Sequence, residues 1–314
     1  MKVLVTGGAG FIGATLCERL RSHPTITDVV ALDDLSTGSC DNLVGVDATL
    51  VVGTFLDDDL LDRIVPDIDA IVHLGARPSV PRSLAEPLAS HEANATGTVK
   101  VLEAARRHGV DHVVVASSSS VYGANAELPK RESMVPMPVS PYAVSKLATE
   151  QYALAWQHSF GLRTLAFRFF NVFGPRQAAG HAYAAVVPAF VDAALRGVPV
   201  TVHGDGTQSR DFTSVHTVCD VLTAAVVGGV SHPTPVNLAF GSRITLLHVL
   251  DTLEHVLGRP VARAHVASRP GDVPHSQADN SVLRSLFPHI EPVDFEPALR
   301  DTVEWHRRRV AQPA

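Results

Sequence analysis

The chain has 314 residues, of which 46% are hydrophobic, and a formal net charge of −6. This length and composition indicate a globular protein with a sizeable core, and the acidic balance excludes the basic surface that nucleic-acid binding requires. No apolar run approaches the roughly 18 residues that cross a bilayer, the first predicted strand directly follows Met1, and the three cysteines are scattered. We therefore expect a cytoplasmic protein with free thiols and no membrane partner. We interpret the sixteen histidines as surface and core residues and expect no metal site.

A glycine-rich turn joins the first predicted strand, residues 2–6, to an amphipathic helix that ends near residue 21. Such glycines let the backbone approach a pyrophosphate, which then lies at the N-terminus of the helix. The second predicted strand ends at Asp33, 20 residues after the last glycine, where a ribose-binding carboxylate is expected. Asp33 and Asp34 together would repel a 2′-phosphate, so the pattern predicts NAD rather than NADP. The predicted dinucleotide-binding residues of the turn are Gly7, Gly10, Phe11, Ile12 and Gly13.

Strands and helices then alternate, with strands expected at 49–55, 69–75, 112–118 and 163–170 and helices at 56–65, 88–108 and 141–160. This alternation predicts an α/β protein with a Rossmann doubly wound parallel sheet. After Asn171 the pattern changes to loops, a strand at 236–239 and helices at 182–196, 213–228, 245–257 and 296–308. We predict an NAD-binding Rossmann domain of residues 1–170, which also receives parts of 211–240. Residues 171–314 are expected to form a smaller α/β substrate-binding domain.

Tyr142 and Lys146 lie four residues apart at the start of one predicted helix, so their side chains share a helical face. A phenol has a pKa near 10, and an adjacent ammonium lowers this pKa, so the pair can form a general base. A solvated helix face is the alternative. Ser118 ends a predicted strand, and its hydroxyl is expected to face the Tyr142 helix.

Eight motifs occur in order along the chain: TGGAGFIG, LDDLSTG, HLGARPSVPRS, SSSSVYG, SPYAVSK, RFFNVFGPRQ, GDGTQSRDF and RPGDVPHSQAD. Together they resemble the extended short-chain dehydrogenase/reductase superfamily, and most closely its UDP-glucose 4-epimerases, from Lys2 to Trp305. The resemblance implies that C4 of a UDP-sugar is transiently oxidised. Tyr142 is then the base, Ser118 binds the reacting oxygen, and Lys146 binds the nicotinamide ribose.

The same resemblance extends the set of site residues. It implies cofactor contacts by Leu74, Gly75 and Asn94, and substrate contacts by Ser79, Asn171, Arg210, Arg269, Asp272 and Ser276. Ser276 replaces a tyrosine of hexose-restricted epimerases and leaves room for a 2-acetamido group, so UDP-GlcNAc and UDP-GalNAc are expected beside UDP-glucose and UDP-galactose. Thr54 departs from the usual Asp near the adenine, Gly75 from the usual Ala, and residues 214–216 from a usual Tyr-Val-Asp.

Relatives pair the helices that match 88–108 and 141–160 into a four-helix bundle, so a homodimer is expected. The apolar positions Val101, Leu102, Leu147 and Leu154 would face outward in such a bundle or, alternatively, belong to the core.

Several alternatives stay open. Sugar dehydratases of this superfamily carry Asp and Glu directly after the serine, whereas this chain has Ser119 and Ser120, which disfavours dehydration. A UDP-glucuronate 4-epimerase or decarboxylase, or an epimerase of another nucleotide sugar, would share all the other motifs. A non-catalytic dinucleotide sensor is a distant alternative, because such proteins typically lack the Tyr/Lys pair.

Overall fold

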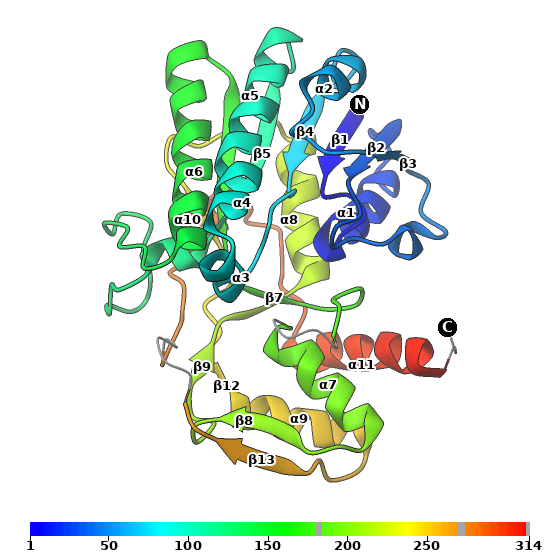
Figure 1. Cartoon of the computed structure of the whole chain (residues 1–314), viewed down its shortest axis with the longest axis vertical. Helices are drawn as coiled ribbons and strands as arrows, with labels where there is room; N and C mark the ends of the chain where they lie inside the picture. The colour runs from blue at the N-terminus through cyan, green and yellow to red at the C-terminus, as the bar shows by residue number, and fades with distance from the viewer. Residues whose placement is uncertain (180–183, 269–273, 312–314) are drawn as a thin grey trace.

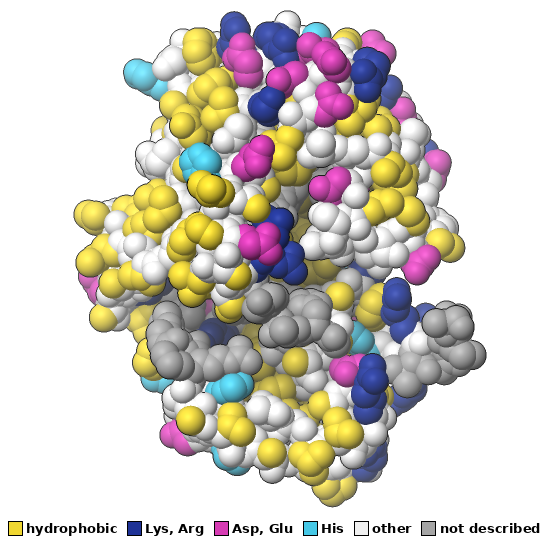
Figure 2. All heavy atoms as spheres, in the orientation of Figure 1, with side chains coloured by type: hydrophobic (Ala, Val, Ile, Leu, Met, Phe, Trp, Pro, Cys, Tyr) yellow, Lys and Arg dark blue, Asp and Glu magenta, His cyan; other side chains and the backbone are white. Residues whose placement is uncertain are grey.

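The computed structural model of the chain describes residues 1–179, 184–268 and 274–311. A seven-stranded parallel sheet with helices on both faces forms the upper part of the molecule, and a smaller α/β lobe forms the lower part (Figure 1). On the face in Figure 2, Lys and Arg side chains are interspersed with Asp and Glu over the upper part. None of the helices that the structure describes is both long and apolar enough to cross a membrane.

The sheet has the strand order β3-β2-β1-β4-β5-β6-β11. The chain starts at the centre, adds strands on one side and then returns to add strands on the other. Ligands in such sheets bind at the point where the order reverses, beyond the carboxyl ends of the strands. The predicted doubly wound α/β fold is therefore confirmed. The strands are β1 Lys2–Thr6, β2 Asp28–Asp33, β3 Thr49–Val52, β4 Ala70–His73, β5 His112–Ser118, β6 Arg163–Phe169 and β11 Val236–Leu238.

Alternating side chains of the strands build a core on each face of the sheet. In β1, Val3 and Val5 pack on the side of α1 and α8, whereas Leu4 packs on the side of α2, α5 and α6. This arrangement requires strands that are apolar on both faces, as the sequence shows. The first face carries α1 Phe11–Arg21, α8 Val215–Val227 and α10 Ser281–Leu286, and the second α2 Asp58–Ile64, α4 Pro87–His91, α5 Gly97–Arg107 and α6 Pro141–Phe160.

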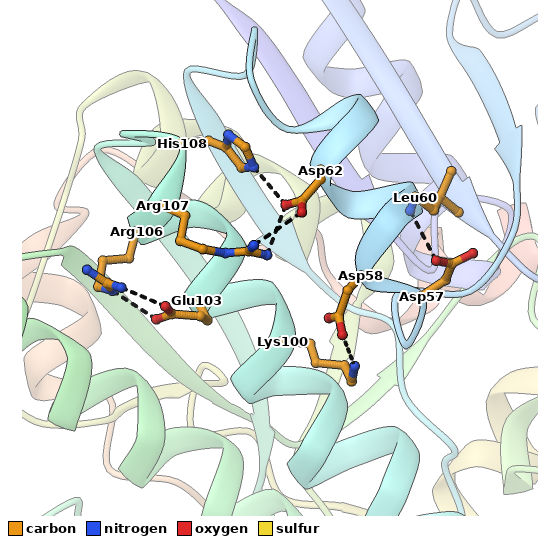
Figure 3. Close-up of polar contacts among 9 residues, drawn as sticks. All are labelled: Asp57, Asp58, Leu60, Asp62, Lys100, Glu103, Arg106, Arg107 and His108. Carbon is orange, nitrogen blue, oxygen red and sulfur yellow. Dashed lines mark hydrogen bonds and ion pairs between the residues drawn. The ribbon is translucent and has the colours of Figure 1, made fainter.

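Ion pairs at the surface tie α2 to α5 (Figure 3). Lys100 donates to Asp58 at 2.5 Å, and Asp62 accepts from His108 at 2.8 Å and from Arg107 at 2.9 Å. Solvent and salt screen such exposed pairs strongly, so burial of the apolar faces dominates the packing of this layer.

The predicted elements differ from the observed ones mainly at their ends. The strand expected at 49–55 ends at Val52, and the helix expected from residue 56 begins at Asp58, because the side chain of Asp57 caps it by accepting from the backbone N–H of Leu60. The helix expected at 88–108 contains a π-helical segment, Glu92–Thr96, between α4 and α5. The helix expected at 213–228 starts two residues later, because residues 212–214 form a strand.

The smaller lobe packs around its own apolar core, which includes Phe190, Val191, Leu250 and Leu299. Two short ladders, β7 with β10 and β9 with β12, lie where the chain passes between the lobe and the sheet. After β10 the chain returns to the sheet as α8 and β11. The remaining elements are α3 Val80–Ala85, β7 Asn171–Phe173, α7 Val186–Arg196, β8 Val200–His203, β9 Ser209–Arg210, β10 Phe212–Ser214, β12 Ile244–Thr245, α9 Leu246–Leu257, β13 Arg263–Val266, α11 Phe295–Ala311 and the 3-10 turns Cys40–Leu43 and Ser119–Tyr122.

Candidate active site

The turn between β1 and α1 leaves no space for side chains at its glycines. Gly7 has a φ of +69°, and a Cβ there would lie 2.9 Å from the backbone nitrogen of Gly75. A Cβ at Gly13 would lie 2.0 Å from the carbonyl oxygen of Gly7. The first N–H groups of α1 have no acceptor within the helix, and they border a pocket that can take an anion. Gly10, Phe11 and Ile12 complete this part of the pocket lining.

Asp33 is fixed at the carboxyl end of β2, where it is 8% exposed. Its Oδ2 accepts from the N–H of Ala9 at 2.9 Å, and its Oδ1 accepts from the N–H of Leu35 at 2.9 Å. Burial raises the pKa of Asp33, and these two hydrogen bonds act in the opposite direction. The carboxylate borders a pocket of about 530 Å³, whose other wall includes residues 75–77.

A second pocket of about 420 Å³ adjoins the first, since Gly7, Asp33 and Gly75 line both. Leu74 lies beside Gly75 in this lining, and Ser118, Tyr142 and Lys146 belong to the same pocket. The two pockets together offer a carboxylate for a ribose, a glycine cradle for a pyrophosphate, and a phenol with an ammonium. The residues present therefore fit a nicotinamide dinucleotide.

Lys146 is held at the start of α6, and it is 5% exposed. The Oγ of Ser140 accepts from the N–H of Ala143 at 3.2 Å and so caps the helix. Lys146 Nζ donates to the carbonyl oxygen of Ala116 in β5 at 2.8 Å. Burial lowers the pKa of Lys146 to about 8, so the side chain is still largely an ammonium at neutral pH.

Tyr142 and Ser118 line the same pocket, and the Oγ of Ser118 accepts from the N–H of Ser120 at 3.2 Å. Burial raises the pKa of Tyr142, and the nearby hydroxyl of Ser118 lowers it. We expected Lys146 to lower the pKa of Tyr142. In the structure the pKa of Tyr142 is raised instead, and Lys146 does not lower it. The physical reason is that desolvation of the phenol dominates, while the ammonium of Lys146 is bonded to Ala116.

A larger cleft of about 920 Å³ lies between the sheet and the smaller lobe. Tyr142 lines both this cleft and the dinucleotide pocket, so it lies where the two meet. Ser79, Asn171 and Arg210 are among the residues that line the cleft, as a substrate role would require. Arg210 Nη1 donates to the carbonyl oxygen of Ser209 at 2.9 Å, and Asn171 lies at the start of β7.

Other residues from the sequence analysis lie elsewhere. The Asn94 side chain is bonded to the backbone N–H of Arg77 at 2.6 Å and to Ser145 Oγ at 2.9 Å, so it supports the loop after β4 rather than lining a described pocket. Thr54 Oγ1 accepts from a backbone N–H at 3.2 Å. Ser276 donates its backbone N–H to Ser209 and does not belong to the cleft lining. Arg269 and Asp272 lie outside the described residues.

Gln177 and Ser83 are among the residues of the site that were not predicted from the sequence. Gln177 lines both the dinucleotide pocket and the larger cleft. Ser83 is fully buried, and its Oγ accepts from the N–H of Tyr142 at 3.0 Å. Both belong to quoted motifs, RFFNVFGPRQ and HLGARPSVPRS, but only the tertiary structure shows what their side chains touch.

Of the two alternatives for the apolar positions of the helices expected to pair, the structure favours the core, and Leu154 is half-buried. Val101 and Leu102 are 1% and 0% exposed and belong to the core between α5 and the sheet. Leu147 packs against a second cluster near Tyr122. The exposed large apolar side chains of α4 and α6 are Leu88, Val144, Tyr152 and Phe160.

The fold and this site define a dinucleotide-dependent α/β enzyme. Residues 3–239 match the NAD dependent epimerase/dehydratase family, and the chain belongs to that family. Membership in this family confirms three predictions: the superfamily, the epimerase type of the enzyme, and NAD as the cofactor.

Three comparisons place the chain within this family. It is 35% identical to the UDP-glucose 4-epimerase of Mycolicibacterium smegmatis, over 98% of this chain and 99% of that protein. It is similar to the structure of the UDP-N-acetylglucosamine 4-epimerase of Methanobrevibacter ruminantium in complex with UDP-N-acetylmuramic acid, with a TM-score of 0.92, 36% identity and 98% of each chain covered. The structure of a tyrosine-to-phenylalanine variant of the UDP-glucuronic acid 4-epimerase of Bacillus cereus, with NAD and a fluorinated UDP-glucuronic acid, has a TM-score of 0.90 and 28% identity, covering 98% of this chain and 100% of that chain.

Proposed function

We propose that the protein is an NAD-dependent UDP-sugar 4-epimerase that interconverts UDP-glucose with UDP-galactose and UDP-GlcNAc with UDP-GalNAc. The position of Tyr142 carries the proposal, since its side chain borders both the dinucleotide pocket and the larger cleft. A group at this junction can touch a sugar in the cleft and a dinucleotide in the pocket at the same time. The volume of the cleft, about 920 Å³, is in the range of small-ligand sites.

The dinucleotide residues of the proposal are those of the two adjoining pockets. The N–H groups at the start of α1 face the pyrophosphate, Asp33 accepts from the adenosine ribose, and Lys146 donates to the nicotinamide ribose. When bound, NAD⁺ supplies the acceptor for the hydrogen of sugar C4 and a positive charge beside the phenol.

The proton chemistry belongs to Tyr142 and Ser118. Tyr142, as phenolate, takes the proton of the sugar 4-hydroxyl and later returns it to the same oxygen, after the ring has turned to present the other face of C4. Ser118 donates to the oxygen on which charge develops. Asn171 and Arg210 hold the diphosphate while the sugar ring turns in the cleft, and a guanidinium suits this task because of its forked donors.

The lining of the cleft favours a neutral sugar and simple epimerisation. Among the described residues that line the cleft and the pocket of about 420 Å³ beside it, Asp33 is the single acid, and it lies at the ribose end. A 4,6-dehydratase needs an acid–base couple at the sugar, which Ser119 and Ser120 do not supply. Arg210 is the single Lys or Arg of the described cleft lining, so a UDP-glucuronate enzyme would need a further cation beside the diphosphate contact.

The test is a panel of UDP-glucose, UDP-galactose, UDP-GlcNAc, UDP-GalNAc and UDP-glucuronate, each incubated with purified enzyme without added NAD and followed by NMR. We expect the 4-epimer of the four neutral sugars to form. A parallel set with added NAD separates a missing cofactor from a missing activity. Formation of a 6-deoxy-4-keto sugar or a decarboxylated pentose would support the alternative enzymes. NAD binding without conversion of any sugar would support the sensor.

We include a homodimer and a cytoplasmic location in the proposal. The exposed apolar side chains on α4 and α6, led by Leu88 at 83% exposure, support pairing of these helices with a second copy. Light scattering of the wild type and of Leu88→Glu tests this, with a mass near 67 kDa expected for the wild type, twice the 33.4 kDa chain. Cys17, Cys40 and Cys219 are unpaired, which supports a reducing compartment.

A further inference from the structure

Residues 170–178, which comprise β7 and the residues on either side of it, form a common wall of the dinucleotide pocket and the larger cleft. Phe170, Val172 and Gln177 line both spaces, and Ala178 also lines the dinucleotide pocket. A dinucleotide that leaves through the cleft must displace this wall, so its rate of release depends on the contacts that hold the wall in place.

Arg176 ties the wall to helix α1. Its Nη1 donates to Glu18 Oε2 at 2.7 Å and lies 3.4 Å from Thr15 Oγ1. The Arg176 side chain is 18% exposed, and that of Glu18 is 57% exposed. The guanidinium thus contacts the solvent-exposed side of α1, whereas Gln177 and Ala178 of the same segment line the pockets.

The backbone of Arg176 is constrained as well. Its φ is +69°, a left-handed conformation that is unfavourable for a residue with a Cβ and is kept where the surroundings fix it. Because of this backbone turn, the side chains of Arg176 and Gln177 point in opposite directions. Arg176 reaches out to α1, and Gln177 turns inward, with its Nε2 donating to the carbonyl oxygen of Val172 at 3.2 Å.

Helix α1 is the same element that meets the dinucleotide. Its first residues, Phe11, Ile12 and Gly13, line the pocket, and the hydroxyl of Thr15 donates to the carbonyl oxygen of Phe11 at 3.0 Å. The Arg176 contact with Glu18 and Thr15 therefore joins the wall to the helix that carries the pyrophosphate-facing amides.

We propose that Arg176 is a positioning residue for the cofactor, and that its ion pair with Glu18 acts as a clasp that slows dinucleotide release. The Arg176–Glu18 ion pair would hold the wall between the dinucleotide pocket and the cleft in place. It would not affect the adenosine end of the dinucleotide site. The proposal rests on NAD binding and not on the identity of the sugar.

The test measures NADH dissociation, as the loss of bound-NADH fluorescence after excess NAD⁺ is added, for the wild type, Arg176→Asn, Glu18→Gln and the double variant. Asparagine tolerates the left-handed backbone but lacks the guanidinium, and Glu18→Gln changes an exposed side chain. We expect each single variant to release NADH about three- to five-fold faster, the size expected for a partly exposed charge pair. The double variant should release NADH at the rate of Arg176→Asn alone, because both substitutions remove the same contact.

Arg300→Asn is the matched control, since it breaks a similar pair with Glu296 on α11 at 2.9 Å, and it should leave NADH release unchanged. Unchanged release in Glu18→Gln, or additive effects in the double variant, would overturn the clasp. Because the assay contains no sugar, its failure is separate from failure of the UDP-sugar panel.

Discussion

Glu150 of α6 and Arg168 of β6 form a buried bidentate ion pair. Arg168 Nη2 and Nε donate to the two carboxylate oxygens of Glu150 at 2.6 and 3.0 Å, and the side chains of Arg168 and Glu150 are 2% and 0% exposed, respectively. Ser117, the neighbour of Ser118, donates to the same carboxylate at 2.8 Å. One buried acid therefore joins α6, β5 and β6 and sets the position of Ser118 relative to the helix of Tyr142.

Removing the charge of Glu150 should destabilise the protein severely. Glu150→Gln leaves the buried Arg168 cation without a counter-ion, and we expect the free energy of unfolding to fall by roughly 3–5 kcal/mol. Urea denaturation measures this loss. The double variant Glu150→Leu/Arg168→Met should be more stable than Glu150→Gln, because no buried charge is left unpaired. A loss below about 1 kcal/mol in Glu150→Gln would contradict this account.

Ser83→Ala should lower both stability and turnover. The substitution removes the acceptor of the half-buried Tyr142 N–H, which costs about 1 kcal/mol, and it loosens the start of α6. Ser90→Ala is the matched control, since Ser90 is 1% exposed and its hydroxyl has no hydrogen-bond partner in the described part of the chain. Thermal unfolding and steady-state kinetics should show a loss for Ser83→Ala and little change for Ser90→Ala. Equal effects of the two substitutions would refute a specific role for Ser83.

The sequence predicts the sheet and the glycine turn well, because both depend on local patterns. Apolar strands between amphipathic helices specify a doubly wound sheet, and Gly13 is required by its close approach to Gly7, six residues earlier.

The supporting contacts depend on the tertiary structure instead. Asn94, expected at the cofactor, is engaged with the backbone of Arg77, and no spacing in the sequence indicates that pairing. Ser83 meets Tyr142 across 59 positions of the chain. The pKa of Tyr142 could not be predicted from the Tyr-x-x-x-Lys spacing, because burial of the phenol is set by segments from both halves of the chain.

The pH dependence of stability should report the buried ammonium of Lys146. Burial lowers its pKa from 10.5 to about 8, so the folded protein holds fewer protons than the unfolded chain between these pH values. Stability attributable to Lys146 therefore rises as the pH increases from about 8 to 10.5, by roughly 3 kcal/mol. Below pH 8 the cost of burying the charge is fully present.

Lys146→Met isolates this effect when unfolding free energies are compared at pH 7 and pH 10. The variant should be more stable than the wild type at pH 7, and this advantage should shrink at pH 10. An advantage that is the same at both pH values would show that Lys146 titrates normally.

Ser276→Tyr should change sugar preference if the small side chain leaves room for an acetamido group. We expect kcat/KM for UDP-GlcNAc to fall at least about tenfold, a cost of about 1.4 kcal/mol, while UDP-glucose is epimerised nearly as before. UDP-glucose on the same variant is the internal control for folding. Normal turnover of UDP-GlcNAc by this variant would show that Ser276 does not contact the sugar. Such a result would agree with the described cleft lining, which does not include Ser276.

Tyr142→Phe should abolish most of the turnover and leave the fold and NAD binding intact. The phenol provides the acid–base group, and its loss should lower kcat at least about 100-fold. Tyr122→Phe is the matched control, because Tyr122 is 1% exposed and its hydroxyl donates to Asn237 at 2.7 Å, away from both pockets. That control should lose about 1 kcal/mol of stability and keep kcat within a few-fold of the wild type. Unchanged kcat in Tyr142→Phe, measured with UDP-glucose at saturation, would show that the proton is transferred by another group.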